Sequence, residues 1–288
     1  MYYLLLLIFY PLSLLPFWVL YRISDLGFVV IYHLIGYRKE IIRSNLSHAF
    51  PEKSEAEILR IQRLFYKGFC DQWVETIKLL SIRPKALAAR MRGNWDLCNQ
   101  LTENGKSLYL LSAHNFNWEW LNAAAAYHAP VYFTGVYLPV DSKGFDRLMY
   151  FARSRTGTNL ISMKGLLSGM KAMRGKQYVI GLLADQNPSQ PDVAAWLPFM
   201  HREAPFFRGP EQMARRAKAA VAFVGMEKIK RGHYRIKLET LTEDASQMPE
   251  GAVVAAYVAF VERQLAAQPE NYLWSHRRWK HTRKDAVS

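Results

Sequence analysis

Cysteine is scarce in this sequence: Cys70 and Cys98 are the only two in 288 residues. Two thiols are too few for a disulfide scaffold or a zinc site, so we expect reduced thiols in the cytosol. The chain also has no Gly-x-Gly-x-x-Gly after a predicted strand and no Gly-Lys-Ser/Thr motif. Nucleotide binding therefore lacks support, and we expect neither a cofactor nor a metal ion.

Acidic residues are in the minority, with 24 Asp and Glu against 38 Lys and Arg, which gives a formal net charge of +14. This excess implies an anionic partner, which is a nucleic acid, a membrane surface or an acidic substrate. Apolar residues make up 50% and aromatic residues 14% of the chain, enough for a sizeable core. No repeat, low-complexity tract or linker interrupts the sequence, and its length fits one large domain or two small ones.

Charged residues are missing from the start of the chain, where everything before Arg22 is apolar or aromatic apart from Ser13. This segment is about the length of a membrane-spanning helix, roughly 20 residues. Because Pro11 and Pro16 would kink it, the helix either spans a membrane or lies in its interface, and a buried core helix is the alternative. A cleaved signal peptide fits poorly because a basic start and a small-x-small cleavage site are missing.

These features divide the chain into a transmembrane or interfacial helix at residues 1–22 and a body at residues 23–288. The positive charges that follow the apolar segment place this body on the cytoplasmic side of the membrane. They are Arg22, Arg38, Lys39 and Arg43. Trp, Tyr and cations also alternate from Glu270 onward, a mixture that suits a nucleic acid or a membrane interface. The apolar N-terminus favours a membrane over a nucleic acid as the partner of these residues, so we expect no nucleic-acid partner.

Apolar segments of strand length alternate with helical patterns through the middle of the chain. The three clearest are residues 108–113, 131–138 and 177–184. This alternation predicts an α/β fold with a mainly parallel mixed sheet flanked by helices, extended by antiparallel strands within residues 228–240. Residues 191–207 are expected to be irregular.

A long amphipathic helix is predicted before these strands. Ser54 and Glu57 form a capping-box pattern, and apolar and aromatic positions then recur at helical spacing from Ile58 to Leu80. The aromatic stripe either packs into the core or forms one wall of a groove for an acyl chain.

The candidate catalytic site lies between Ser107 and Trp120. A buried strand ends just before His114 and a helix begins near Asn117, so His114 and Glu119 lie at a strand-to-helix turn. If Asn117 caps the helix, Glu119 lies in its first turn and can fold back on His114. An imidazole oriented by a carboxylate suits proton abstraction from a hydroxyl. The alternative is a surface histidine beside a helix-terminal glutamate.

Asn117 is itself a candidate for binding the substrate. Two further positions are candidates for binding. Asp185 follows the predicted strand 177–184, so a second acidic residue lies at a strand end. Arg208 precedes Gly209-Pro210, where proline takes the favoured first position of a helix. Arg208 and the free backbone N–H groups there could hold an anion such as phosphate, although a plain helix N-terminus explains the pattern equally well.

Several separate motifs resemble one family, the late acyltransferases of lipid A biosynthesis of the lauroyl/myristoyl type, which are related to the glycerol-phosphate acyltransferases. The resemblance covers nearly the whole chain in order, including the apolar N-terminus. The matching residues are Asn45-Leu46, Phe50-Pro51, His114 and Glu119 with Asn117-Trp118, Ala184-Asp185-Gln186, Pro198-Phe199, Gly209-Pro210 with Ala214, and His276-Arg277-Arg278-Trp279-Lys280. Asn115-Phe116 and Met200-His201 depart from the common pattern, which often has a glycine in each pair.

The resemblance implies an acyltransferase-like fold and transfer of a fatty acyl chain from acyl carrier protein, or coenzyme A, to a hydroxyl. The implied acceptor is a phosphorylated glucosamine lipid, a precursor of lipid A in lipopolysaccharide biosynthesis, at the cytoplasmic face of the inner membrane. The family's catalytic pair corresponds to His114 and Glu119. An arginine linked to substrate corresponds best to Arg155, with Arg153 second, and Asp185 matches the acidic residue at a strand end.

A mechanism without a covalent intermediate fits these residues. His114 takes the proton of the acceptor hydroxyl as it attacks the thioester, and Glu119 orients His114. Ser112 as a nucleophile is the rival, but it has no separate base. Other open alternatives are an acyltransferase for another glycolipid or phospholipid, and a membrane-anchored lipid- or nucleic-acid-binding protein without catalytic activity.

Overall fold

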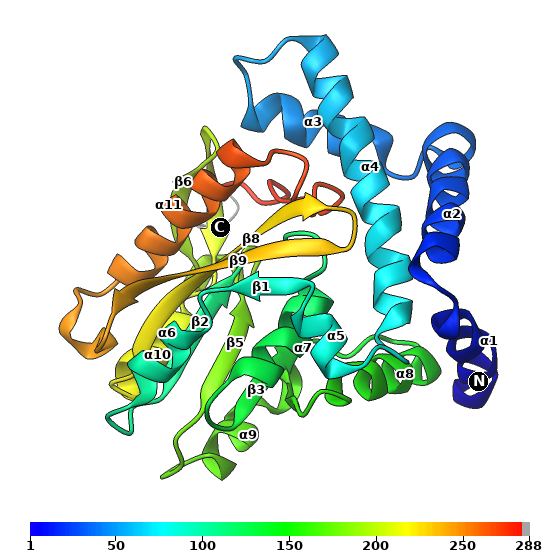
Figure 1. Ribbon diagram of the computed structural model, residues 1–288. Coiled ribbons are helices and arrows are strands. Elements are labelled where there is room, and N and C mark those ends of the chain that lie inside the picture. The colour runs from blue at the N-terminus through cyan, green and yellow to red at the C-terminus, as the bar shows by residue number, and fades with distance from the viewer. Residues whose placement is uncertain (284–288) are drawn as a thin grey trace.

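The computed structural model describes residues 1–283, in which a mixed sheet of seven strands lies between layers of helices (Figure 1). The sheet order is β1-β9-β8-β2-β5-β3-β4, and each neighbouring pair is parallel except β8 with β9. The strands are β1 (Met91–Gly93), β2 (Leu108–Ser112), β3 (Phe133–Tyr137), β4 (Asn159–Ser162), β5 (Val179–Leu183), β8 (Ala220–Lys230) and β9 (His233–Thr242). The predicted mainly parallel α/β sheet with an antiparallel extension is confirmed.

The helices cover both faces of this sheet. They are α3 (Lys39–Ala49), α4 (Glu55–Lys78), α5 (Pro84–Ala88), α6 (Asp96–Thr102), α7 (Trp118–His128), α8 (Lys143–Ser154), α9 (Leu166–Ala172), α10 (Gly209–Arg216) and α11 (Ala252–Ala267). Short 3₁₀ turns are η2 (Met163–Gly165), η3 (Pro191–Val193) and η4 (Ala245–Gln247).

Strand β2 explains why two hydrophobic cores form. All of its residues are buried, as expected for a central strand with both faces covered. Since successive side chains point to opposite faces, Tyr109 and Leu111 join one core with α11 and the C-terminal segment. Leu108 and Leu110 join the other core, with α5, α6 and α7. The strand is therefore held between two helical layers, and its end is placed firmly.

Helix α4 begins at the predicted capping box. The Glu57 carboxylate accepts from the Ser54 backbone N–H at 2.9 Å, and the Ser54 hydroxyl accepts from the Glu57 N–H at 3.4 Å. Further along the helix, Gly68 packs against the ring of Phe116, and a Cβ atom at Gly68 would lie 2.2 Å from the ring carbon Cε2. A glycine therefore allows α4 to approach the chain just after His114.

The N-terminal segment differs from the single helix expected at residues 1–22. It forms α1 (Tyr2–Leu14), then α2 (Phe17–Phe28), which continues as the π-helical η1 (Val29–Ile35). The break falls at Leu15 because the following proline disfavours helical backbone before it and has no N–H to donate. The proposed boundary at residue 22 thus lies inside α2. In Figure 1 these helices lie at the side of α4 and α8, which they contact.

A second, smaller sheet lies in the segment expected to be irregular. Strands β6 (Ala195–Phe199) and β7 (Arg202–Phe206) form an antiparallel hairpin. Its two turn residues, Met200 and His201, both have positive φ, 47° and 67°, as the tight turns that suit hairpin twist require. Glycine is the easiest residue for such a turn, which explains why a chain lacking it there gave no hairpin signal.

Both cysteines are buried in the described structure. Burial raises the pKa of the Cys70 thiol and of the Cys98 thiol to about 12 each. The two thiols therefore stay protonated at neutral pH and act as small core side chains.

Candidate active site

Parallel pairing of β2 with β5 brings two strand ends together. Ser112, the last residue of β2, pairs with Leu183, the last residue of β5. His114 and Asp185 each follow two residues later, so both lie at the carboxyl edge of the sheet. Ligands of open α/β sheets bind at this edge.

His114 is hydrogen-bonded to Asp185 through two groups. The ring atom Nδ1 lies 2.8 Å from Asp185 Oδ1, and the His114 backbone N–H donates to Oδ2 at 3.1 Å. Since a carboxylate accepts only, Nδ1 carries the proton and Nε2 is left with a lone pair. The Asp185 side chain is 1% exposed, whereas that of His114 is 17% exposed. The imidazole is thus oriented from inside the protein and remains accessible.

Asp185 is charged despite its burial. Burial by itself raises the pKa of this carboxyl, but the electrostatic attraction of the His114 ring and the hydrogen bonds from its ring and backbone N–H outweigh it. The pKa of Asp185 is therefore held below its usual range. A charged carboxylate on Nδ1 fixes the tautomer and stabilises an imidazolium when Nε2 takes a proton.

Glu119 does not take the role expected from the sequence, because its carboxylate faces a different partner. Arg153 of α8 donates to both oxygens, from Nε at 2.7 Å and from Nη2 at 2.6 Å. The indole Nε1 of Trp118 donates to Glu119 Oε1 at 3.2 Å. The same indole contacts the His114 ring edge-to-face, with the ring centroids 5.0 Å apart. His114 and Glu119 are thus both neighbours of Trp118, while the carboxylate that orients His114 is Asp185.

The two candidate arginines have different environments. Arg153 joins the site through Glu119, as described. Arg155 follows α8 and donates from Nη1 to the backbone carbonyl of Leu79, the residue after α4, at 2.6 Å. The structure therefore brings Arg153, and not the better motif match Arg155, to the candidate site.

Asn117 caps α7 as expected, and it lies in the interior. Its backbone is left-handed, with φ at 66°, and its side-chain oxygen accepts from the Trp120 N–H at 3.1 Å. Its side-chain nitrogen donates to Glu75 of α4. The side chain is fully buried, so it supports the turn and does not offer the expected surface for substrate.

Sequence reasoning missed the structural roles of three residues. Two of them support the turn after His114, and the third supports the chain after Asp185. Asn271 takes a hydrogen bond from the Phe116 N–H at 2.7 Å and gives its carbonyl to the side chain of Asn115, also at 2.7 Å. Glu75 holds Asn117. Glu75 had a signal in the sequence, because it continues the spacing of buried positions in α4. These are Ile61, Phe65, Gly68, Gln72 and Glu75.

The third is His276, in the C-terminal motif. Burial, and after it the charge of Arg278, lowers the pKa of the His276 ring to about 4, so the ring is neutral at physiological pH. Its Nε2 accepts from the Asn187 N–H at 3.4 Å, and Arg278 donates to the Asn187 side-chain oxygen at 2.6 Å. The C-terminal segment thus supports the chain just after Asp185. The C-terminal motif, although distant in sequence, therefore lies next to the candidate site.

Ser112 is not placed as a nucleophile. It is 3% exposed, and its hydroxyl donates to the Val224 carbonyl at 2.8 Å. Across residues 1–283, no group of three or more His, Cys, Asp or Glu side chains is placed to hold a metal ion.

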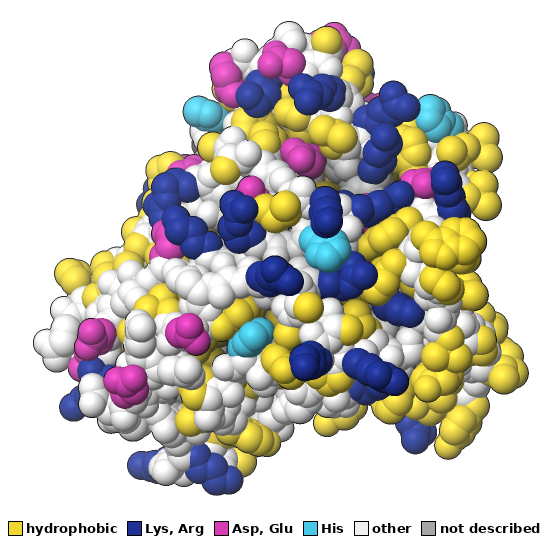
Figure 2. Space-filling model, in the orientation of Figure 1, with side chains coloured by type: hydrophobic (Ala, Val, Ile, Leu, Met, Phe, Trp, Pro, Cys, Tyr) yellow, Lys and Arg dark blue, Asp and Glu magenta, His cyan; other side chains and the backbone are white. Residues whose placement is uncertain are grey.

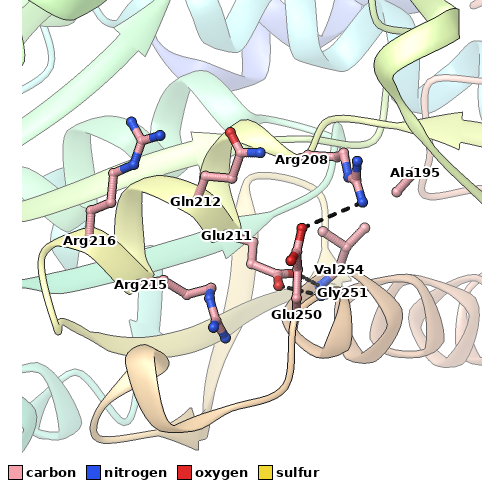
Figure 3. Close-up of a pocket in the computed structure, with 9 residues that line it drawn as sticks. All are labelled: Ala195, Arg208, Glu211, Gln212, Arg215, Arg216, Glu250, Gly251 and Val254. Carbon is pink, nitrogen blue, oxygen red and sulfur yellow. Dashed lines mark hydrogen bonds and ion pairs between the residues drawn. The ribbon is translucent and has the colours of Figure 1, made fainter.

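Arg208 lies in a separate pocket of about 190 Å³ between α10 and the start of α11 (Figure 3). Its Nη2 is 3.7 Å from Glu250 Oε1, and both side chains are exposed. Glu211 caps α11 there, accepting from the N–H groups of Gly251 at 2.5 Å and Val254 at 3.0 Å. The residues that line this pocket include neither His114 nor Asp185, so Arg208 lies apart from the candidate site.

The fold and site together place an accessible imidazole, held by a buried carboxylate, at the edge of an α/β sheet, an arrangement that suits removal of a proton from a reacting group. Comparison with known families gives the class more closely. The model for bacterial lipid A biosynthesis acyltransferases matches residues 1–281, so the chain belongs to this family and is an acyltransferase. The lipid A biosynthesis lauroyltransferase of Escherichia coli K12 is a similar protein. It is 26% identical over 298 aligned residues, covering 95% of this chain and 89% of that protein.

The lowered pKa of Asp185 predicts a pH-dependent contribution to stability. A carboxyl with a depressed native pKa stabilises the fold above its unfolded pKa of about 3.9, and this contribution disappears as the pH falls through the native value. Urea unfolding in detergent between pH 7 and pH 3 should therefore show the advantage of the wild type over Asp185→Asn shrinking in acid. Asp192→Asn, at an exposed position, is the matched control. Parallel curves for the wild type and Asp185→Asn would contradict a charged Asp185.

Proposed function

We propose that this acyltransferase moves a fatty acyl chain from a thioester, carried by acyl carrier protein or coenzyme A, to a hydroxyl of a lipid A precursor. The observation that carries the proposal is the His114–Asp185 pair, at 2.8 Å, at the carboxyl edge of the sheet. Family membership supports the acceptor class. A base of this kind is what attack by an alcohol on a thioester requires.

The reaction proceeds through direct transfer. Nε2 of His114 takes the proton of the acceptor hydroxyl while its oxygen forms a bond to the thioester carbonyl carbon. The tetrahedral intermediate then collapses, the carbon–sulfur bond breaks, and the imidazolium returns the proton to the departing thiolate. A thiol has a pKa of about 8.5, so it leaves with little assistance from an acid. Asp185 stabilises the imidazolium between the two proton transfers.

Arg153, held by Glu119, places a guanidinium in the neighbourhood of this base. The bidentate pair fixes the guanidinium of Arg153, and Trp118 connects it to the ring of His114. We assign Arg153 to the anionic groups of the substrates, either the developing oxyanion or a phosphate of the acceptor. Glu119 acts by holding Arg153. The net charge of +14 favours approach of an acidic carrier protein and a phosphorylated lipid.

The central test measures acyl transfer by purified protein supplied with acyl carrier protein thioesters and a lipid A precursor. The product should gain the mass of one acyl chain. His114→Ala and Asp185→Asn should each lower kcat by about 10⁴-fold, as loss of a base or of its orienting carboxylate does, and Glu119→Ala should also abolish most transfer by releasing Arg153. Ser112→Ala is the control and should stay active. Full activity in His114→Ala would rule out the assigned base.

The arginine assignment predicts a contrast between neighbours. Arg153→Ala should lower kcat/KM for the acceptor by roughly 100-fold, the size of effect seen when one donor to a developing charge is lost. Arg155→Ala removes only a hydrogen bond to the Leu79 carbonyl, so it should lower the melting temperature slightly and leave the kinetics intact. Steady-state kinetics with each substrate varied in turn check this. The reverse pattern would move the role to Arg155.

We further propose that the N-terminal helices lie in the membrane interface. One helix of the described chain, Phe17–Ile35, is long and apolar enough to cross a bilayer. It contains Arg22 and Asp25, however, and the Asp25 carboxylate pairs with Arg231 of the body at 2.6 Å. Charges of this kind are costly at the centre of a bilayer.

Contacts with the body also favour this arrangement. At the break between α1 and α2, Lys78 of α4 donates to the carbonyls of Ser13 at 2.7 Å and Leu15 at 2.9 Å. The outward side of the helices is apolar and is bordered by Lys and Arg (Figure 2). Its exposed large side chains include Tyr3, Leu4, Leu7, Ile8, Leu14, Trp18, Ile23, Leu26, Val29, Leu34 and Ile35. An apolar face edged by cations matches acyl chains below anionic headgroups.

This arrangement predicts how the protein binds vesicles. Replacing Leu7 and Leu26 together by Glu should weaken flotation with anionic vesicles by at least tenfold, because each exposed leucine contributes about 1.5 kcal/mol when buried in lipid. Val193→Glu, at an exposed apolar site on η3, is the control. Resistance of the wild type to alkaline carbonate extraction, with residues before Phe17 and after Ile35 on opposite sides of the vesicle, would instead indicate a spanning helix.

A further inference from the structure

Glu75 is a fully buried carboxylate beneath the candidate active site. It lies in the last turns of α4, at 0% exposure, among side chains of α2, α7 and β9. Burial raises its pKa, and the charge of Lys228 and the hydrogen bond from Tyr234 oppose that rise. A charged or polar group in such a place is costly unless every oxygen has partners. The partners of the Glu75 carboxylate therefore decide whether it is stable in the interior.

Three side chains from three different elements donate to this carboxylate. Tyr21 of α2 donates to Oε1 at 2.8 Å, and Tyr234 of β9 donates to Oε2 at 2.7 Å. The third donor is the side-chain amide of Asn117, which also reaches Oε2. In addition, the indole of Trp120 donates to the backbone carbonyl of Glu75 at 2.7 Å. Glu75 thus joins α4 to both the cap and the first turn of α7.

We propose that Glu75 is a positioning residue for acyl transfer, which holds Asn117 and thereby the turn that carries His114. This inference rests on the function proposed above. Asn117 lies three residues after His114 in a left-handed backbone conformation, which is uncommon for residues other than glycine. The hydrogen bond from its side-chain amide to Glu75 is one contact that holds this turn, and the packing of Phe116 on Gly68 is another.

An oxygen acceptor is needed in this position because all three partners donate. The amide of Asn117 can only donate through its nitrogen, since its oxygen already accepts from the Trp120 N–H. Glu75→Leu keeps a similar volume and removes the acceptor, so it breaks the link to the turn after His114. A glutamine can turn its oxygen toward Asn117 and Tyr234 and its NH₂ group toward the phenol of Tyr21, which can rotate to accept. Glu75→Gln is therefore the conservative variant that keeps the link.

Asp71 offers a matched control one helical turn earlier on α4. It is also buried, and it accepts from Ser24 of α2 at 2.7 Å, from Lys228 at 2.9 Å and from Arg231 at 2.8 Å. Like Glu75, it fastens α2 to the body. Its hydrogen-bond partners within residues 1–283 do not include the turn after His114, so Asp71→Asn tests helix attachment separately from turn positioning.

The experiment compares these variants at a temperature where circular dichroism shows each to be folded. Glu75→Leu should lower kcat by roughly 10- to 100-fold, as small misplacements of a catalytic group do, with KM for the thioester within about twofold of the wild type, and Glu75→Gln should keep most of kcat. Asn117→Gly, which keeps the positive φ without strain but removes the amide, should give a similar loss. The double variant should be no slower than the worse single variant, because both changes break the same link. Asp71→Asn should lower the melting temperature and keep kcat.

A readout independent of turnover separates this inference from the proposed function. The Nδ1–H proton resonance of His114, which reports the hydrogen bond to Asp185, should shift or broaden in Glu75→Leu and Asn117→Gly but not in Asp71→Asn. An inactive wild type with these spectral changes would reject the proposed function and keep the positioning role. Unchanged kcat and spectra in Asn117→Gly, or an equal loss of kcat in Asp71→Asn, would overturn the positioning role whatever the fate of Glu75→Leu.

Discussion

The parallel register between β2 and β5 is the constraint on which the candidate site depends. It places the last residues of both strands side by side, so that a histidine and an aspartate, distant in sequence, meet two residues further on. Neither strand can slip without moving its buried side chains to the wrong face, because side chains alternate along a strand. The two hydrophobic cores therefore fix the geometry of the candidate site as well as the fold.

The turn after His114 is held from two directions. On one side Asn271, in the segment after α11, bonds the backbone of Phe116. On the other side α4 contributes Glu75 to Asn117 and leaves room for the Phe116 ring at Gly68. Both supports come from segments far from the turn in sequence. Helix α4 also contacts α2, so the same element connects the apolar N-terminal helices to the candidate site.

Local patterns predicted much of this structure. The buried strands, the capping box of α4 and the cap of α7 were all readable because each depends on neighbouring residues. Asp185 at a strand end was also visible. The partners of His114 and Glu119 were not, because the choice depends on side-chain directions set by tertiary packing: Glu119 in the first turn of α7 meets Arg153 of α8. The hairpin of β6 and β7 was missed because Met200-His201 is an unusual sequence for its turn.

The burial of both thiols has a consequence for chemistry under oxidative stress. Oxidants and electrophiles react with thiolates, and at a pKa of about 12 the thiolate fraction of Cys70 or Cys98 near pH 7 is on the order of 10⁻⁵. Neither side chain is open to a peroxide or an alkylating reagent while the fold is intact. The activity of the enzyme should therefore not depend on the redox state of its surroundings. Any oxidative loss of activity would result from oxidation of methionine or from unfolding.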